Sequence, residues 1–477
     1  MYTYQTEKLK RELDKLRIHE LREVGGMVGV SSPSALNFVP LRDAIIDIVT
    51  GRTGVPQRSM RGRPRKESGN EERYRKLFYQ CRVNLDEEGA APVAERHGQA
   101  SPNPAFDFVY RYAETERLFE DGLRQRAMGF EEEYDFENET GTFEGYLEVY
   151  PDGSGFVRGS FSEGAGDAHL SAELIRSHKL RGGDYLKGRT KGRYQSKYPE
   201  AAEIETEIGT ERADFDKLFP KRAQERLRFG GKSATARFFD RFAPVGKGQL
   251  GLIFAPPHAG RTQLFAELLS ALQAGDPDVE RIAVLIDKRA EEAAEFTRSM
   301  GGKTACSSFG ERAFGHIRTA ELALEHAKRL AESGKDVVLV LDSVTRLARA
   351  YNLVAARSGR PLAGGLESAA LEAVKKYLSK ARNLEGAGSL TILAAVLETE
   401  SVLDRCVADE LAGCEDVRIV LDGSVADAGF FPAFHLAKSG NNRAELLLSE
   451  QERKSLNEMR AELPEDACKA AEKFFIA

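Results

Sequence analysis

The spacing of apolar residues changes several times along the chain. Between Leu9 and Leu21 leucines recur every three to five positions, which is typical of an amphipathic helix, and we predict a helical module over residues 1–51. Residues 52–140 lose this periodicity and pass from a basic run to an acidic one. We expect a polar, largely disordered insertion there, with a single helix around Phe106–Met128.

From residue 141 onward, apolar residues alternate with polar ones in short runs that glycines interrupt. The runs TFEGYLEVYPDGSGFVRGS and DAHLSAELIRSHKLRGGDYLKGRTKGRY contain several short strand candidates with turns between them. Short strands in this number are typical of a small Greek-key barrel of the OB or cold-shock type. We predict such a barrel over residues 141–220.

The last block, residues 221–477, alternates apolar strands with amphipathic helices. The strand candidates are QLGLIFA, RIAVLID, DVVLVLD and SLTILAAVL, and helical stretches such as RTQLFAELLSALQAG separate them. Apolar strands between amphipathic helices indicate a parallel sheet covered on both faces, so the fold class is α/β. A chain of 477 residues exceeds the size of a single core, in agreement with this division.

Composition excludes several classes of protein. Lys and Arg number 69 against 75 Asp and Glu, a net charge of −6, so a nucleic-acid site must be a local patch rather than bulk charge. Five cysteines without a C-x-x-C pair predict neither a disulfide framework nor a zinc knuckle. Apolar runs fall far short of the roughly 20 residues of a membrane span, and the charged N-terminal segment is unlike a signal peptide. We expect a cytoplasmic protein with no membrane partner.

A strand, a loop and a helix in succession form a candidate phosphate-binding loop. The segment Ala255–Thr262, APPHAGRT, has the length of G-x-x-x-x-G-K-[ST], but Ala255 stands at the first glycine and Arg261 at the lysine. In such loops backbone N–H groups and the helix N-terminus hold the phosphates, the cation reaches their outer oxygens, and the hydroxyl takes Mg²⁺. Arginine keeps the charge but is bulkier and planar. An ordinary glycine turn before a helix is the alternative.

Two further predicted strands end in charged residues. Asp342 follows four apolar residues in VLVLDS, where a Walker-B carboxylate would hold Mg²⁺ together with Thr262; the alternative is a helix N-cap. The strand AVLID ends in Asp287–Lys288–Arg289. In a regular parallel sheet these ends meet at one edge, where ligands bind. The sequence therefore predicts ATP and Mg²⁺ as cofactors at this edge.

Long stretches of the chain carry the pattern of one family. They are PVGKGQLGLIFAPPHAGRTQLF, LIDKRAEEAAEFTRSM, AKRLAESGKDVVLVLDSVTRLARAYN, SGRPLAGGLESAAL, ARNLEGAGSLTILAAVLETE and, upstream, GYLEVYPDGSGFVR and LRIHELREVGGMVGVSS. These stretches closely resemble the bacterial transcription termination factor Rho, over most of the chain except about residues 52–140. The resemblance implies a RecA-like homohexameric ring that binds single-stranded RNA in the barrel, threads it through the pore with ATP, and acts on the RNA polymerase transcription complex.

The resemblance also implies which residues contact the nucleotide. The stretches GKGQLG and HAGRTQ match the ATP-binding segments, Arg289 matches a nucleotide-contacting arginine, and Phe431 matches the base-stacking aromatic. The implied contacts are Gly246, Lys247, Gly248, Gln249, Leu250, Gly251, His258, Ala259, Gly260, Arg261, Thr262, Gln263, Arg289 and Phe431.

For RNA, the resemblance points to the barrel and to one pore loop. The segment Gly153–Arg158 matches the primary RNA motif, in which the second aromatic is kept as Phe156 and the first is replaced by Ser154. Each base stacked on a ring is worth about 1–3 kcal/mol, so RNA capture should be weakened but not lost. For Phe156 alone, a core position is the alternative. The implied RNA contacts are Gly153, Ser154, Gly155, Phe156, Val157, Arg158, Arg193, Tyr194, Arg357 and Arg360.

Four positions that serve hydrolysis depart from the family pattern. Lys288 replaces the glutamate that orients the attacking water, and lysine cannot accept that water's proton at neutral pH unless its pKa falls by several units. Arg261 replaces the loop lysine, and the two trans-acting arginines align with Gly429 and Asn442, with Arg443 one residue away. An arginine finger is worth on the order of 10³–10⁵ in rate.

The interpretation that follows is a Rho-type termination factor that binds nascent RNA and ATP but hydrolyses ATP poorly. The residues expected to carry the remaining chemistry are Arg261, Asp342, Arg289 and Arg443. The alternative is a non-motor Rho paralogue, a nucleic-acid-binding or regulatory assembly protein that uses ATP structurally.

A short basic segment in the insertion has the shape of an AT-hook. Arg61–Pro64, within RGRPRK, would place arginines in a narrow A·T minor groove of DNA. A solvated charge cluster with non-specific affinity for nucleic acid is the alternative and is favoured about two to one.

Overall fold

The structure is a computed structural model, and its described residues fall into two units, residues 1–100 and residues 101–477. It describes residues 13–14, 16–28, 37–49, 140–164, 166–194, 198–207, 209, 212–300 and 302–476. Three predictions lie outside these ranges: the insertion over residues 52–140 (apart from Thr140), the helix around Phe106–Met128, and the Arg61–Pro64 segment.

The described residues of the first unit include helices α2 (Ile18–Val28) and α3 (Phe38–Val49). Leu21 of α2 and Leu41 of α3 are fully buried, and the two helices pack against each other. Both helices lie within the segment for which the leucine spacing predicts a helical module.

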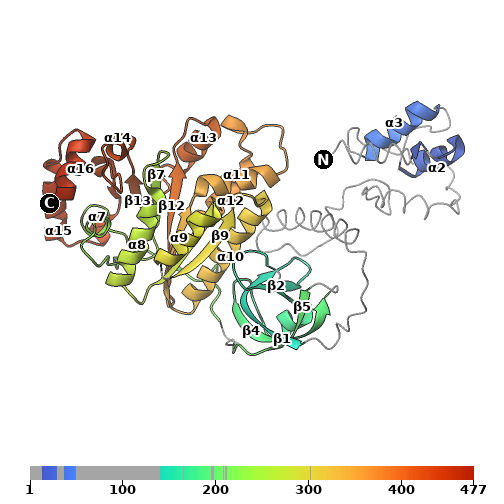
Figure 1. The fold of residues 1–477 in the computed structure, drawn as a ribbon, viewed down its shortest axis with the longest axis horizontal. Helices are drawn as coiled ribbons and strands as arrows, with labels where there is room; N and C mark the ends of the chain where they lie inside the picture. The colour runs from blue at the N-terminus through green and yellow to red at the C-terminus, as the bar shows by residue number, and fades with distance from the viewer. Residues whose placement is uncertain are drawn as a thin grey trace. The chain divides into compact units, whose positions relative to one another are not determined.

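Five strands of the second unit close into a barrel in the order β1-β2-β3-β5-β4 (Figure 1). They are β1 (Thr140–Val149), β2 (Gly155–Arg158), β3 (Ala168–Leu170), β4 (Tyr185–Tyr194) and β5 (Tyr198–Ile204), with helix α6 (Ala172–Ser177) between β3 and β4. Leu147, Val157 and Leu186 pack inside the barrel. The predicted barrel is confirmed.

A second sheet follows the path β14-β13-β7-β12-β10-β8-β9, with β11 beside β12 and β6 beside β11. Neighbours from β13 to β9 are parallel. The strands are β6 (Pro220–Lys221), β7 (Leu250–Ala255), β8 (Glu280–Lys288), β9 (Lys303–Ser308), β10 (Asp336–Asp342), β11 (Arg382–Leu384), β12 (Ser389–Leu397), β13 (Val417–Val420) and β14 (Gly440–Asn441). The predicted parallel α/β sheet is confirmed, and its four predicted strands are β7, β8, β10 and β12.

Helices cover both faces of this sheet (Figure 1). The α-helices are α7 (Ala234–Arg241), α8 (Arg261–Gly275), α9 (Ala290–Met300), α10 (Ala313–Glu332), α11 (Val344–Val354), α12 (Ser368–Leu378), α13 (Val402–Leu411), α14 (Gly423–Asp427), α15 (Glu450–Ala461) and α16 (Ala467–Ile476). Three short 3-10 helices are η4 (Ala363–Gly365), η5 (Leu436–Lys438) and η6 (Ala444–Leu446). None of the helices in the described ranges is long and apolar enough to span a membrane.

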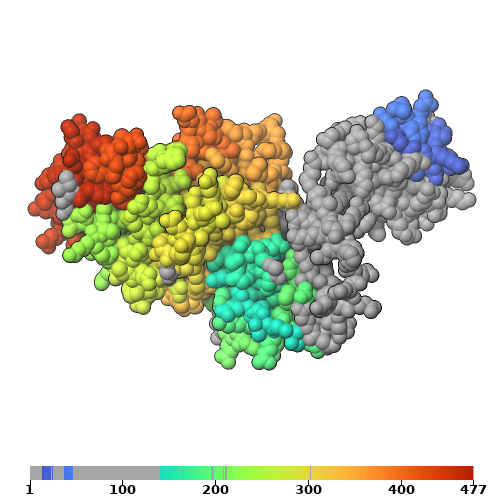
Figure 2. All heavy atoms as spheres, viewed as in Figure 1, coloured from blue at the N-terminus to red at the C-terminus, as the bar shows by residue number. Residues whose placement is uncertain are grey.

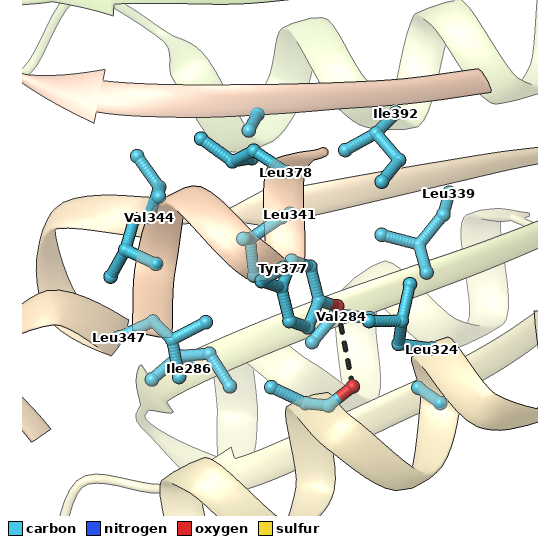
Figure 3. Packing of buried hydrophobic residues seen from close by; sticks show 14 of the residues in the cluster. Val284, Ile286, Leu324, Leu339, Leu341, Val344, Leu347, Tyr377, Leu378 and Ile392 are labelled. Atoms are coloured by element: carbon cyan, nitrogen blue, oxygen red, sulfur yellow. Dashed lines mark hydrogen bonds between the residues drawn. The ribbon is translucent and has the colours of Figure 1, made fainter. Parts of the chain in front are cut away.

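Alternate residues of β10 belong to two separate cores, because successive side chains of a strand point to opposite faces. Leu339 and Leu341 pack with α10, α11 and α12, whereas Val338 and Val340 pack with α7 and α8. Figure 3 shows the first core, where Tyr377 of α12 lies against the sheet and its hydroxyl donates to the Ala320 carbonyl oxygen at 3.2 Å. Two apolar layers therefore fix the strand ends that carry the charged residues.

The barrel packs against helix α10 of the domain that contains the parallel sheet. Arg318 of α10 forms ion pairs with Glu148 at 3.1 Å and Glu163 at 2.7 Å, and His326 Nδ1 lies 2.9 Å from the Gly183 carbonyl oxygen. In the space-filling view the cyan and green atoms of the barrel adjoin the yellow region of the chain (Figure 2). The contacts join the two domains through buried and half-buried charges.

Candidate functional site

The phosphate loop, Ala255–Thr262, joins the carboxyl end of β7 to helix α8. Gly260 is the N-cap of α8 and has a left-handed φ of 77°, a conformation that favours glycine. A Cβ on Gly260 would also come within 2.9 Å of the Phe431 ring. The first N–H groups of α8 are free to bind an anion, as at other helix N-termini. A left-handed glycine before a helix N-terminus that has no side-chain cap agrees with the predicted phosphate-binding loop.

Phe431 lies beside the same loop. Its side chain is 40% exposed, and its ring is the nearest neighbour of a Cβ built on Gly260. The aromatic residue assigned to the nucleotide base therefore stands next to the phosphate loop, with an open surface.

Three polar side chains meet at the end of the loop. Lys288 is the last residue of β8, and Asp342 is the last residue of β10. The Lys288 Nζ atom lies 2.8 Å from Asp342 Oδ2 and donates to Thr262 Oγ1 at 2.9 Å. The Thr262 hydroxyl in turn donates to Asp342 Oδ2 at 3.0 Å. Asp342 is fully buried and Lys288 is 3% exposed, so this ion pair is part of the interior.

Arg261 faces the other oxygen of the same carboxylate. Its Nε atom lies 3.5 Å from Asp342 Oδ1, beyond a good hydrogen bond. Burial raises the pKa of Asp342, but the charges of Arg261 and Lys288 outweigh it, so the pKa falls below its usual value. Burial also lowers the pKa of Arg261, and attraction to Asp342 only partly opposes this. Asp342 is therefore a carboxylate between two cations.

A magnesium ion does not fit this arrangement. Thr262 and Asp342 come together as predicted, but the Lys288 ammonium contacts both of the oxygens that would bind the ion or its water. At an effective dielectric constant of about 20, a divalent ion roughly 3 Å from an ammonium would be repelled by on the order of 10 kcal/mol. The predicted magnesium site at Thr262 and Asp342 is corrected accordingly: a lysine occupies it.

The N-cap alternative for Asp342 is also settled. Helix α11 begins after Ser343, whose side chain accepts a hydrogen bond from Arg346 N at 3.3 Å, so Ser343 is the cap. The Arg346 side chain lies at the edge as well, with Nη1 3.2 Å from the Ile286 carbonyl oxygen and 3.6 Å from Asp287 Oδ2. Sequence reasoning missed Arg346; the only signal was a cation one turn after the strand-end aspartate.

The stretch Gly246–Gly251 does not meet the phosphate loop. It precedes and begins β7, whereas the loop follows that strand, and six strand residues span roughly 20 Å. Lys247 forms ion pairs there with Glu225 at 3.0 Å and Asp336 at 2.8 Å, and Gln249 accepts the Gly246 N–H at 2.7 Å. Within one chain this stretch therefore lies at the edge of the sheet opposite the phosphate loop, and its nucleotide contacts stay a prediction.

The remaining residues that were predicted to contact the nucleotide or to act as an arginine finger lie at one or the other of two opposite edges of the sheet. Arg289 is exposed directly after Lys288, and Gln263 is exposed on α8, where it donates to Glu267 at 2.9 Å. Arg443 lies on the far edge, one residue after Asn442, and its Nη1 is 3.4 Å from Glu445. Within one chain Arg443 is therefore remote from the phosphate loop.

In the barrel, the predicted RNA motif begins with a tight turn. Gly153 has a left-handed φ of 86°, and Asp152 Oδ1 accepts hydrogen bonds from Ser154 N at 2.8 Å and Ser154 Oγ at 2.7 Å. A Cβ on Gly155 would come within 2.4 Å of the Glu148 carbonyl oxygen, so that position needs glycine. The motif therefore has a structural reason for its glycines.

Phe156 and Arg158 are buried, contrary to the exposure that RNA stacking and backbone contact require. Phe156 is 1% exposed, although it points away from the Val157 side of β2. Arg158 is 0% exposed and forms ion pairs with Glu148 at 2.6 Å and Asp167 at 2.5 Å. The correction has a physical reason: the guanidinium is held by two carboxylates that the sequence motif did not indicate.

The other RNA candidates are more open. Tyr194 and Arg193 are half-buried, and the Tyr194 ring stacks on His169 with centroids 3.5 Å apart. Between α11 and η4, Arg360 is exposed and the Arg357 side chain is 68% exposed, 3.7 Å from Glu367. Of the predicted RNA contacts, these two arginines are the ones placed to meet a phosphate without rearrangement.

Comparison with known proteins matches both domains. The family "Rho termination factor, RNA-binding domain" matches residues 143–211, and "ATP synthase alpha/beta family, nucleotide-binding domain" matches residues 235–440. Transcription termination factor Rho of Streptosporangium roseum is 42% identical over 317 residues, covering 65% of this chain and 82% of that protein. The chain belongs to the transcription termination factor Rho family. The Rho proteins of Haemophilus influenzae and Bacillus subtilis are each 39% identical, covering 66% and 69% of this chain and 80% of either relative.

Solved structures with lower sequence identity are also similar to part of this Rho-family chain. A prototypical ATPase from a type III secretion system of pathogenic bacteria has a TM-score of 0.47 at 23% identity, covering 55% of this chain and 77% of that one. The assembled ATPase EscN of enteropathogenic E. coli has a TM-score of 0.46 at 23% identity, covering 55% and 63%.

In this Rho-family chain the unforeseen feature of the site is the contact between Lys288 and Asp342. The sequence showed a lysine where a water-orienting glutamate was expected, and it showed the aspartate one strand away. It did not show that the two side chains would meet, because that depends on β8 and β10 being neighbours with Leu285 opposite Asp342. The site is thus a Rho phosphate loop with an internal cation.

Proposed function

We propose that this Rho-family chain forms a ring of identical subunits that holds ATP at the phosphate loop, binds single-stranded RNA, acts on the RNA polymerase transcription complex, and hydrolyses ATP slowly. The observation that carries the proposal is the ion pair between Lys288 and Asp342 at 2.8 Å. It affects the step of hydrolysis and leaves the groups that bind phosphate in place.

Nucleotide binding is supported by what remains at the loop. The N-terminus of α8 and the left-handed Gly260 offer backbone donors, which need no particular side chain. Arg261 supplies a cation, and Phe431 supplies a partly open ring for a base. These groups bind triphosphate and base without taking part in bond cleavage.

Slow hydrolysis is supported by the chemistry of Lys288. An ammonium has three donors and no acceptor, so it cannot orient a water by accepting its hydrogen. Its neighbours Asp342 and Thr262 are engaged with it. Of the other nearby carboxylates, Asp287 contacts Arg346, and Glu292 of α9 faces the Lys288 ammonium at 3.7 Å. The water therefore lacks the group that the family uses to orient it.

A ring is supported by the position of Arg443. On its own chain it lies at the sheet edge opposite the phosphate loop, so it can approach a nucleotide only on a neighbouring subunit. Its distance of 3.4 Å to Glu445, with both side chains about half exposed, is a weak contact that such a neighbour could replace.

The non-motor alternative has the same observation in its favour. If turnover is absent rather than slow, the bound nucleotide would serve as a structural part of the assembly, and the chain would regulate termination instead of driving it. The fate of bound ATP separates the two functions.

The first prediction concerns whether bound ATP is hydrolysed. Full-length protein loaded with ATP labelled at the γ-phosphate, mixed with poly-pyrimidine RNA and quenched at intervals, should retain mostly ATP. The double variant Lys288→Glu, Arg261→Lys should convert ATP faster, because it restores an acceptor and a point charge. Stoichiometric conversion to ADP by the unmodified chain on mixing with RNA would contradict slow hydrolysis. Complete retention over many hours would favour the non-motor alternative.

The second prediction concerns Arg357 and Arg360, the two exposed arginines between α11 and η4. The variant Arg357→Ala, Arg360→Ala should bind a labelled pyrimidine oligomer more weakly, and the slope of log affinity against log salt should fall by about 1 per arginine. Fluorescence anisotropy at several salt concentrations measures both. The matched control is Arg453→Ala, an exposed arginine on α15. An unchanged slope in the double variant would remove these residues from the RNA site.

A further inference from the structure

We propose that the Lys288 ammonium takes the place of a divalent cation, so that this chain binds its nucleotide without Mg²⁺. The proposal deepens the proposed function and rests on nucleotide binding at the phosphate loop. It names a specificity-determining residue: Lys288 makes the site accept a free nucleotide rather than a magnesium complex.

The position of the ammonium is the first argument. Nζ lies 2.9 Å from Thr262 Oγ1 and 2.8 Å from Asp342 Oδ2, the two oxygens on which a metal ion in such a loop depends. Both oxygens are therefore already neutralised by a positive charge. An ammonium has three N–H groups, and these contacts use two of them. The nearest further acceptor is Glu292 Oε2, which is 3.7 Å away and beyond a good hydrogen bond, so the third N–H can donate to a phosphate oxygen.

The backbone holds Lys288 in this position. The register between β8 and β9 shifts between Leu285 and Lys288, and Asp287 has a left-handed φ of 58°. Such an irregularity re-aims the side chain that follows it. The Lys288 carbonyl oxygen then accepts a hydrogen bond from Phe309 N at 2.9 Å, which fixes the strand end. The cation is thus built into the sheet, and it cannot be removed as a bound ion can.

The charge balance is the second argument. Asp342 is a single buried carboxylate, and it faces two cations, Lys288 and Arg261. These three groups sum to a net charge of +1, and the half-exposed Glu292 carboxylate, 3.7 Å from Lys288 Nζ, brings the sum to zero before any ion is added. Phosphate oxygens can therefore meet two buried cations at the loop without a metal, whereas a divalent ion would lie beside both of these cations.

The test compares nucleotide affinity with and without a divalent ion. Calorimetric titration of the full chain with ADP should give dissociation constants that agree within about twofold in EDTA and in MgCl₂. For Lys288→Met, which removes the cation but keeps the length of the side chain, Mg²⁺ should tighten ADP binding by about tenfold or more. Lys335→Met, at an exposed lysine just before β10, is the matched control and should behave as the unmodified chain.

A second measurement detects the metal itself. Mn²⁺ in the presence of ADP, followed by its electron paramagnetic resonance signal, should remain free with the unmodified chain and become bound with Lys288→Met or Lys288→Gln. The comparison on the unmodified chain needs no variant, so it decides the question even if both substitutions impair folding.

The outcomes are distinct. ADP binding by the unmodified chain that requires Mg²⁺, with Mn²⁺ bound, would overturn the role of Lys288 and leave the proposed function standing. An absence of ADP and ATP binding in both EDTA and MgCl₂ would overturn the proposed function and this inference with it. Equal binding in both conditions with free Mn²⁺ supports both.

Discussion

Replacing Asp342 with alanine is expected to lower the free energy of unfolding of the nucleotide-binding domain by about 3–5 kcal/mol. Asp342 is fully buried between Lys288 and Arg261, and its removal leaves two cations without their carboxylate in a water-poor interior. Urea unfolding of the full chain without nucleotide, followed by far-ultraviolet circular dichroism, measures the change.

The control for this prediction is the same substitution in a chain that lacks the buried ammonium. In a Lys288→Met background, Asp342→Ala should cost clearly less, because one of the two stranded charges is gone. The pH dependence has a defined sign, because the pKa of Asp342 is lowered in the folded state. The contribution of Asp342 to the free energy of unfolding is present above the ordinary pKa of 3.8 and is lost as the pH falls through the lowered pKa. A cost below about 1 kcal/mol at neutral pH would show that the three side chains do not form this cluster.

Replacing Arg158 with methionine is expected to destabilise the barrel by a similar amount, about 3–5 kcal/mol. Arg158 is 0% exposed, and its guanidinium pairs with Glu148 at 2.6 Å and Asp167 at 2.5 Å while donating to the Tyr150 hydroxyl at 2.7 Å. Burial alone would lower the pKa of Arg158, but the charges of Glu148 and Asp167 and the neighbouring Tyr150 raise it, so the arginine stays charged. Its loss would leave the buried Asp167 carboxylate without a cation and Glu148 with Arg318 alone.

Hydrogen exchange of peptides from β1 and β2, detected by mass spectrometry, locates this effect in the barrel. The matched control is Arg189→Met, because Arg189 pairs with Glu205 at 3.0 Å with its side chain 67% exposed, and such pairs are worth less than about 1 kcal/mol. If Arg158→Met left exchange in β1 and β2 unchanged but weakened RNA binding, Arg158 would be an RNA contact as first predicted, and its burial would be relieved on binding.

The fold could be predicted where the apolar pattern is continuous. Strands β7, β8, β10 and β12 are buried on both faces, so each appears in the sequence as an unbroken apolar run. Strands β9 and β13 were not predicted, because only alternate residues of each are buried and the runs are short and mixed. The local sequence therefore predicts the fully buried strands of a parallel sheet better than the strands that are only partly buried.

The site could be predicted in part, for a related reason. The phosphate loop follows from a strand, a loop and a helix in order, and the meeting of Thr262 with Asp342 follows from strand ends at one edge of the sheet. The place of Phe431 was implied only by the resemblance to Rho. The contacts of Gly246–Gly251 were implied by the resemblance alone, and the sequence did not show that strand β7 separates this stretch from the phosphate loop of its own chain. Burial of Arg158 depends on Glu148 and Asp167, which lie outside the motif and carry no signal of their own. Phe156 packs against the rings of Tyr150, His169 and Tyr198, which also lie outside the motif.

The measurement that tests the central claim most directly is steady-state phosphate release by the unmodified full chain, with and without poly-pyrimidine RNA. We predict turnover at least about a hundredfold below the roughly 10 s⁻¹ typical of enzymes, with ADP binding intact. The reason is that Lys288 engages Asp342 and Thr262 and orients no water. Vigorous RNA-dependent release that Asp342→Ala abolishes, which excludes a contaminating enzyme, would contradict the account and make this chain an ordinary Rho motor.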